Sequence, residues 1–148
     1  MKGFTLIELI IVIVIIMILG ALSVPFFQFF QASSELYTLT DEVTRTLRNA
    51  QISAVTGQND SNWGVYFNDT EKKFVLFRGD SYLNRDSGYD LVFDFQEIFT
   101  VENDFGNEVV FSKYQGLPSV TGTLTLRSRN SQMHQVIING LGLINASY

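Results

Sequence analysis

Hydrophobic and polar positions divide this chain into parts with different patterns. Residues 4–27 are almost entirely apolar. The exceptions are Thr5, Glu8, Ser23 and Pro25. About 20 predominantly apolar residues in a helix suffice to cross a bilayer, so the stretch predicts a membrane-spanning helix, which we assign to residues 4–30. Proline is tolerated in membrane helices and usually bends them, so Pro25 predicts a helix kink.

The next segment, residues 31–57, places its apolar residues on one side of a helix. They recur at intervals of three and four, as one helical face requires. This stripe consists of Leu36, Leu39, Val43, Leu47, Ala50 and Ala54. Asp41 and Arg45 lie off the stripe, four residues apart with the acid first, which favours a helix. Gly57 is a suitable stop, and one helix over residues 4–56 would be about 80 Å long.

After Gly57 the hydrophobic period changes to two, which indicates β-strands. The segments 63–67 and 73–77 flank a turn-rich sequence and predict a β-hairpin. Further strands are predicted over residues 91–101, 108–114, 123–127, 135–138 and 141–144. We therefore expect an α+β fold. Its long N-terminal helix, transmembrane in the first half and amphipathic in the second, packs on an antiparallel β-sheet head of six or seven strands over residues 58–148.

Composition and charge narrow the choice of partners. The 148 residues suit one globular domain plus an anchor, and the absence of cysteine excludes disulfides and cysteine-ligated metals. A formal net charge of −5 disfavours a nucleic-acid partner. Residues 80–108 hold eight acids and one base, whereas residues 111–148 hold three bases and no acid. This asymmetry suggests oriented contacts within the fold or between copies, although two solvated faces would give the same pattern.

Glu8 is an acid at one end of the apolar run. A carboxylate at the centre of a membrane helix costs about 2.5–3.5 kcal/mol, and less near the interface. No lysine or arginine occurs between residues 3 and 43, so a cationic partner has to come from elsewhere. Lys2 and the N-terminal amine are the only positive charges before the run, and they favour a cytoplasmic N-terminus with export of the remainder.

The sequence Lys2-Gly3-Phe4-Thr5-Leu6-Ile7-Glu8 resembles the processing site of type IV prepilins and type II secretion pseudopilins. The resemblance implies a leader of residues 1–3, cleavage between Gly3 and Phe4 by a prepilin peptidase, and N-methylation of Phe4. It also implies that Glu8 serves assembly by meeting the new N-terminal amine of a neighbouring subunit. Such pairing would remove the desolvation penalty of a buried carboxylate.

The implied partners are other pilin or pseudopilin subunits, the prepilin peptidase, an inner-membrane assembly platform and membrane lipid. The implied location is the bacterial inner membrane, crossed once with the head outside the cytoplasm, and then a pilus or pseudopilus. The head narrows the resemblance to the minor pseudopilins called GspH/FimT. It does so through residues 47–57, the strand beginning at Trp63, and the closing segments 122–126 and 136–142.

Other interpretations remain open on the residues alone. A conventional secretory signal could end at Ala21-Leu22-Ser23 and release a soluble domain, and a plain signal anchor would leave Glu8 unexplained. Lys113, Arg127 and Arg129 could contact DNA phosphates, as in minor pilins for DNA uptake. Asp86 and Asp90 could bind calcium, because hard cations prefer clustered oxygens. A solvated loop and solvent-facing strand residues explain the same features.

Catalytic patterns are missing from the sequence. It contains no GxSxG, HExxH or GxxxxGK[ST] motif. His134 is the only histidine, lies in a predicted hairpin, and is interpreted as a solvated residue at a strand edge. We therefore expect a structural subunit with no enzymatic activity, no cofactor and no metal.

Overall fold

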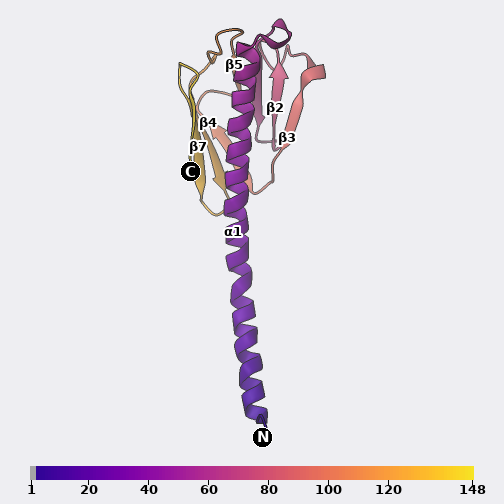
Figure 1. Cartoon of the computed structure of the whole chain (residues 1–148), viewed down its shortest axis with the longest axis vertical. Helices are drawn as coiled ribbons and strands as arrows, with labels where there is room; N and C mark the ends of the chain where they lie inside the picture. Colours follow the sequence, from indigo (N-terminus) through magenta and orange to yellow (C-terminus); the bar gives the residue numbers. More distant parts are fainter. Residues whose placement is uncertain (1–2) are drawn as a thin grey trace.

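The computed structural model describes residues 3–148, except for the side chains of residues 22–29. Its main element is one α-helix, α1 (Leu6–Val55), of 50 residues, which is about 75 Å long at 1.5 Å per residue. The upper part of α1 lies against a β-rich head, and the lower part extends alone to the N-terminus (Figure 1). The predicted long helix is confirmed, with both ends within two residues of the expected positions.

Within the described residues, no helix is apolar over enough of its length to span a bilayer.

The proposed span, residues 4–30, includes residues 22–29, whose side chains lie outside the described part of the chain. The backbone of α1 is helical through position 25. The Pro25 side chain is among those not described, so the helix kink stays a prediction.

The second half of α1 is amphipathic as predicted. All six residues of its apolar stripe are buried, with exposed fractions of 0–5%. Asp41 and Arg45 form the expected i,i+4 ion pair at 2.9 Å. The helix ends at Val55, and Gly57 follows with a φ of +65°. A left-handed glycine after the last helical residue is a common helix stop because it carries no Cβ.

The first sheet contains β1 (Trp63–Asn68), β2 (Lys73–Arg78), β3 (Leu91–Asp94) and β5 (Glu108–Phe111). Its strand order is β3-β2-β1-β5, and all neighbours are antiparallel. The predicted hairpin is β1–β2, paired from Trp63↔Arg78 to Asn68↔Lys73. A short 3₁₀ helix, η1 (Gln58–Asp60), leads into β1, and another, η2 (Ser87–Tyr89), precedes β3.

The second sheet contains β4 (Phe99–Asn103), β6 (Gly122–Ser128), β7 (Met133–Ile138) and β8 (Ile144–Ser147). Its order is β4-β6-β7-β8, again antiparallel throughout. The two sheets lie on either side of α1, and β4 and β7 are separated from β2 and β3 by the helix in Figure 1. Residues from both sheets and from the α1 stripe form one hydrophobic core.

The expected antiparallel head is confirmed, but the described residues form eight strands rather than six or seven, and these strands are divided between two sheets. The predicted strand 91–101 is two strands, β3 and β4, which pair in different sheets. The turn between them is closed by a hydrogen bond from the Phe99 N–H to the Gln96 carbonyl, 3.0 Å long.

The predicted last strand, 141–144, is displaced, because β8 runs over Ile144–Ser147. Gly142 has a φ of +79° and closes a turn on Asn139. The Asn139 side chain accepts hydrogen bonds from the N–H groups of Leu141 and Leu143 at 3.0 and 2.8 Å. These bonds hold the segment in a turn rather than in a strand.

A second, smaller cluster lies on the outer side of the first sheet. Val75, Phe77 and Val110 are buried there, outside the main core. Tyr82, from the loop after β2, covers them by stacking on Tyr66 with ring centroids 3.8 Å apart. Gly64 accommodates the Phe77 ring, since a Cβ at that position would lie 2.6 Å from Phe77 Cζ.

Candidate assembly site

The residues around the predicted cleavage point lie in exposed, non-helical backbone. Residues 3–5 precede α1, and Phe4 is 80% exposed. A Cβ built at Gly3 would have no neighbour within 4 Å. Met1 and Lys2 lie outside the described residues. The bond between Gly3 and Phe4 is therefore part of an open segment next to the first helical turn.

Thr5 caps the start of α1. It has extended backbone angles, and its hydroxyl accepts a hydrogen bond from the Glu8 N–H at 3.4 Å. A threonine followed three residues later by a glutamate is the capping-box pattern. A carboxylate in the first turn is also stabilised by the positive end of the helix dipole. This pattern is visible in the sequence alone, and it gives Glu8 a local role as well.

Capping of α1 by Thr5 does not neutralise the charge of the Glu8 carboxylate. In the part of the chain that the structure describes, Glu8 makes no ion pair. The Thr5 hydroxyl bonds to the backbone N–H of Glu8 and not to the Glu8 carboxylate, so capping supplies no counter-charge. Among residues 3–148, the structure thus provides no cationic partner for Glu8.

The first part of α1 is apolar and exposed on every side. Each large hydrophobic residue from Leu6 to Leu19 is between 44% and 77% exposed. A helix that is hydrophobic all round is stable only when lipid or other helices surround it. This surface and Glu8 belong to the same helix, so any surrounding helix that covers the surface also approaches the carboxylate.

The carboxylates of the calcium hypothesis already have cationic neighbours. Asp86 pairs with Arg78 and accepts a hydrogen bond from the Gly88 N–H at 3.1 Å. Asp90 pairs with Arg85 at 2.8 Å, and this pairing raises the pKa of the Arg85 guanidinium. No group of three potential metal ligands occurs among the described residues. Calcium would have to displace two guanidinium groups, and its binding stays a prediction.

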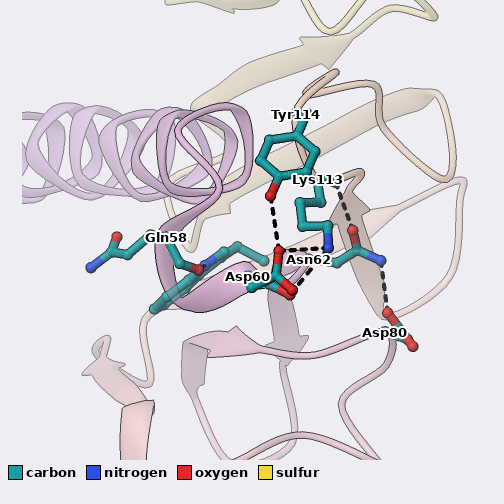
Figure 2. A network of polar contacts seen from close by, with 7 residues as sticks. Gln58, Asp60, Asn62, Asp80, Lys113 and Tyr114 are labelled. Carbon is teal, nitrogen blue, oxygen red and sulfur yellow. Dashed lines mark hydrogen bonds and ion pairs between the residues drawn. The ribbon is translucent and has the colours of Figure 1, made fainter.

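Lys113 belongs to a polar network at the far end of α1. Its ammonium lies 2.8 Å from the Asp60 carboxylate, which also accepts a hydrogen bond from the Tyr114 hydroxyl at 2.8 Å (Figure 2). The hydrogen bond from Lys113 is the main cause that lowers the pKa of Asp60. In the same network the backbone N–H of Lys113 donates to Asn62 at 2.6 Å. This lysine therefore joins two loops of the head.

The three bases of the DNA hypothesis do not form one patch. Lys113 adjoins Tyr114, whose N–H donates to the carbonyl of Ala54 near the end of α1. Arg127 and Arg129 lie at the turn between β6 and β7, where Gln132 approaches Ser33. Residues 33 and 54 are about 30 Å apart along the helix. Only Arg127 and Arg129 are brought near each other, and DNA contact stays a prediction.

The expected solvated histidine at a strand edge is wrong. His134 is half-buried on β7, which lies between β6 and β8. Its Nδ1 is 3.0 Å from the Thr40 hydroxyl, which already donates its only proton to the Leu36 carbonyl at 2.8 Å. The hydroxyl must therefore accept from Nδ1–H. Burial lowers the pKa of His134. The residue acts as a structural contact between β7 and α1.

Gln51 has a role that sequence patterns did not reveal. It lies in the segment 47–57 that carries the GspH/FimT resemblance. Its amide nitrogen donates to the carbonyl oxygens of Gly116 at 3.0 Å and Gly142 at 2.8 Å. It thereby holds two loops, far away in sequence, against the end of α1. Its position in this segment was a signal in the sequence, but residue spacing does not reveal its partners, which are 65 and 91 residues away.

Two comparisons with known proteins found a similarity, one to a sequence motif and one to a solved structure. A family model described as the prokaryotic N-terminal methylation motif matches residues 1–24. Among solved structures, the fold is similar to that of the minor pseudopilin EpsH from the type 2 secretion system of Vibrio cholerae, with a TM-score of 0.60. The two chains are 10% identical, and the match covers 76% of this chain and 96% of the EpsH chain. None of the curated proteins compared by sequence matches this chain.

The EpsH likeness concerns the fold, an N-terminal helix packed on antiparallel sheets. The methylation motif concerns the residues around Gly3, Phe4 and Glu8. The two findings differ in kind: one is a sequence motif over residues 1–24, and the other is a similarity of the fold.

Proposed function

We propose that this protein is a minor pilin or pseudopilin, a structural subunit of a type IV pilus or a type II secretion pseudopilus. It is anchored in the bacterial inner membrane by residues 4–30, with the N-terminus in the cytoplasm and the head outside. A prepilin peptidase removes residues 1–3, Phe4 is N-methylated, and an inner-membrane platform moves the subunit into a helical filament. The role is structural, not catalytic.

One observation carries this proposal: an all-round apolar helix surface with an unneutralised carboxylate in its first turn. In a bundle of such helices the exposed residues from Leu6 to Leu19 become buried against each other. The α-amino group that cleavage creates at Phe4 then provides the cation that Glu8 lacks. In an apolar environment, the attraction between the two charges offsets the free-energy cost of desolvating them. An unpaired charge in the same environment would have no such compensation.

The exposed geometry at Gly3 supports processing at this position. A peptidase binds its substrate in an extended conformation, and the open backbone before Leu6 meets this need without unwinding α1. Residue 3 has space for a larger side chain in the free chain. A block of cleavage by a large residue there would therefore arise in the peptidase, not from misfolding of the substrate.

The assembly step is tested with Glu8→Ala in a bacterium that assembles the wild-type chain. We expect the head to fold normally while incorporation into sheared filaments falls at least about tenfold, since a buried charge left without its partner costs about 3–5 kcal/mol. Glu35→Ala is the matched control, an acid on the same helix beyond the apolar part. Wild-type incorporation of Glu8→Ala would contradict the mechanism.

The processing step is tested with Gly3→Leu. The variant should remain as an unshifted precursor on a gel, whereas the wild type should be shorter by three residues. N-terminal sequencing of the mature protein separates the main alternatives. A chain that begins at methylated Phe4 supports the proposal, and one that begins at Val24 indicates a conventional secretory signal and a soluble domain.

A further inference from the structure

The outer strand of the first sheet, β3, has one side without a neighbour. Figure 1 shows β3 at the border of the head, beyond β2 as seen from α1. The Phe95 N–H donates to the Lys72 carbonyl of the β2 side at 2.8 Å. Peptide groups along a strand alternate in direction, so those of Phe93 and Leu91 also face β2. The peptide groups of Val92 and Asp94 therefore point to the free side.

A groove runs between α1 and the β3 residues Leu91, Phe93 and Asp94. It consists of three adjoining hollows, which share Thr38 and Glu42 at one junction and Asn49 at the other. It extends along α1 from Glu35 to Ser53, which is about 27 Å. An extended chain rises about 3.3 Å per residue, so the groove accommodates about eight residues.

The upper end of the groove is the most apolar part. A hollow of about 480 Å³ is lined there by Ile52, Trp63, Leu76, Tyr89 and Leu91, among others. Leu91 and Ile52 are 55% and 59% exposed, although they face a hollow next to the core. Side chains of an added strand alternate between two faces, and every second one could bury apolar surface here.

The groove is acidic. Its lining contains five acids and one base: Glu35, Asp41, Glu42, Asp90, Asp94 and Arg45. Asp41 is paired with Arg45, and Asp90 with Arg85. Glu35, Glu42 and Asp94 make no ion pair among the described residues. Lys73 lies opposite Asp94 in the sheet, but its ammonium pairs with Glu71.

Among the strands that the structure describes, none suits the groove. The outer strands of the two sheets are β3, β5, β4 and β8, and none contains a lysine or an arginine. The strand bases of the described chain lie in β2 and β6, which are paired on both sides. A second copy therefore offers no free basic edge to β3.

We propose that the groove beside β3 is a docking site for an extended, basic segment of a different polypeptide. The segment adds to the first sheet as a fifth strand, through hydrogen bonds to the peptide groups of Val92 and Asp94. Basic side chains meet Glu42 and Asp94, and an apolar one enters the hollow at Leu91. The proposal uses the head alone and does not depend on cleavage or filament assembly.

The test uses the full-length protein in phosphatidylcholine nanodiscs, which carry no net lipid charge. The probe is a fluorescent octapeptide, Lys-Val-Lys-Leu-Lys-Val-Lys-Leu, measured by fluorescence anisotropy against empty nanodiscs. We expect saturable binding, with changes in the amide NMR signals of Val92 and Asp94. The same peptide with N-methyl groups on alternate amides, and an acidic version with Glu for Lys, should each bind at least about tenfold more weakly.

Val92→Pro removes an N–H that points to the free side and that β2 does not use, so the sheet should survive. It should weaken binding of the basic peptide about tenfold, whereas Val92→Thr, which keeps the N–H, should not. The double variant E42Q/D94N provides a second measurement independent of the backbone, and it should also weaken binding at low salt. Equal affinity for all peptides, or no effect of either change, would overturn the proposal. The protein is also measured without peptide. If it self-associates and Val92→Pro abolishes this self-association, the groove binds a second copy of this chain, and the proposal is overturned.

Discussion

Gln51 makes a two-bond contact at the end of α1 whose contribution to stability can be worked out from the structure. Its amide donates to the carbonyls of Gly116 and Gly142. Both glycines have positive φ, +65° and +79°, and lie directly on the side chain, since a Cβ at Gly142 would be 2.3 Å from Gln51 Nε2. The loops are therefore shaped around this amide.

Gln51→Leu keeps the volume of the side chain and removes both hydrogen bonds. Each bond contributes about 0.5–1.5 kcal/mol net, so the unfolding free energy should fall by about 2 kcal/mol. For a chain of this length, that corresponds to a melting temperature lower by about 4–8 °C. The head holds the single tryptophan, Trp63, which is 4% exposed. Thermal unfolding in nanodiscs can therefore be followed by its fluorescence.

Gln51→Glu separates hydrogen bonding from packing. An ionised carboxylate would face two carbonyl oxygens, and this raises its pKa in the folded chain above the unfolded value of about 4.3. The stability of this variant should therefore be highest below that value and fall as the pH rises through the folded pKa. The control is Gln115→Leu, which replaces an exposed residue in the loop that contains Gly116. A melting temperature of Gln51→Leu within about 1 °C of the control would refute the reasoning.

Two further predictions concern the head. Gly64→Ala should lower the unfolding free energy by about 1–3 kcal/mol in urea titrations, because the new methyl group would overlap the Phe77 ring; wild-type stability would show that the ring moves aside freely. The stability of the wild type should decrease as the pH falls below about 6.5, because burial lowers the pKa of His134 and the unfolded chain then binds the proton more tightly. His134→Gln should reduce this dependence, and an unchanged pH profile would argue against it.

The sequence by itself determined the parts of this protein that depend on short-range pattern. The apolar stripe of α1, the Asp41–Arg45 pair and the β1–β2 hairpin follow from periods of 3.6 and two. The local arrangement at the N-terminus was equally accessible, since Thr5 and Glu8 are three residues apart. These features lie within one element or across one turn, so the competing conformations are few.

Tertiary structure decided everything that joins distant segments. The strand-forming residues 91–101 gave no sign of being shared between two sheets, because the choice depends on which neighbours offer a free edge. The partners of Gln51 and His134 are 65 to 94 residues away. The acidic excess of residues 80–108 is partly balanced by Arg78 and Arg85, which reach Asp86 and Asp90 only through the folded loop. The periodicity of a sequence indicates which face of a helix or strand is buried. Which residues pack against that face depends on the tertiary structure of the whole chain.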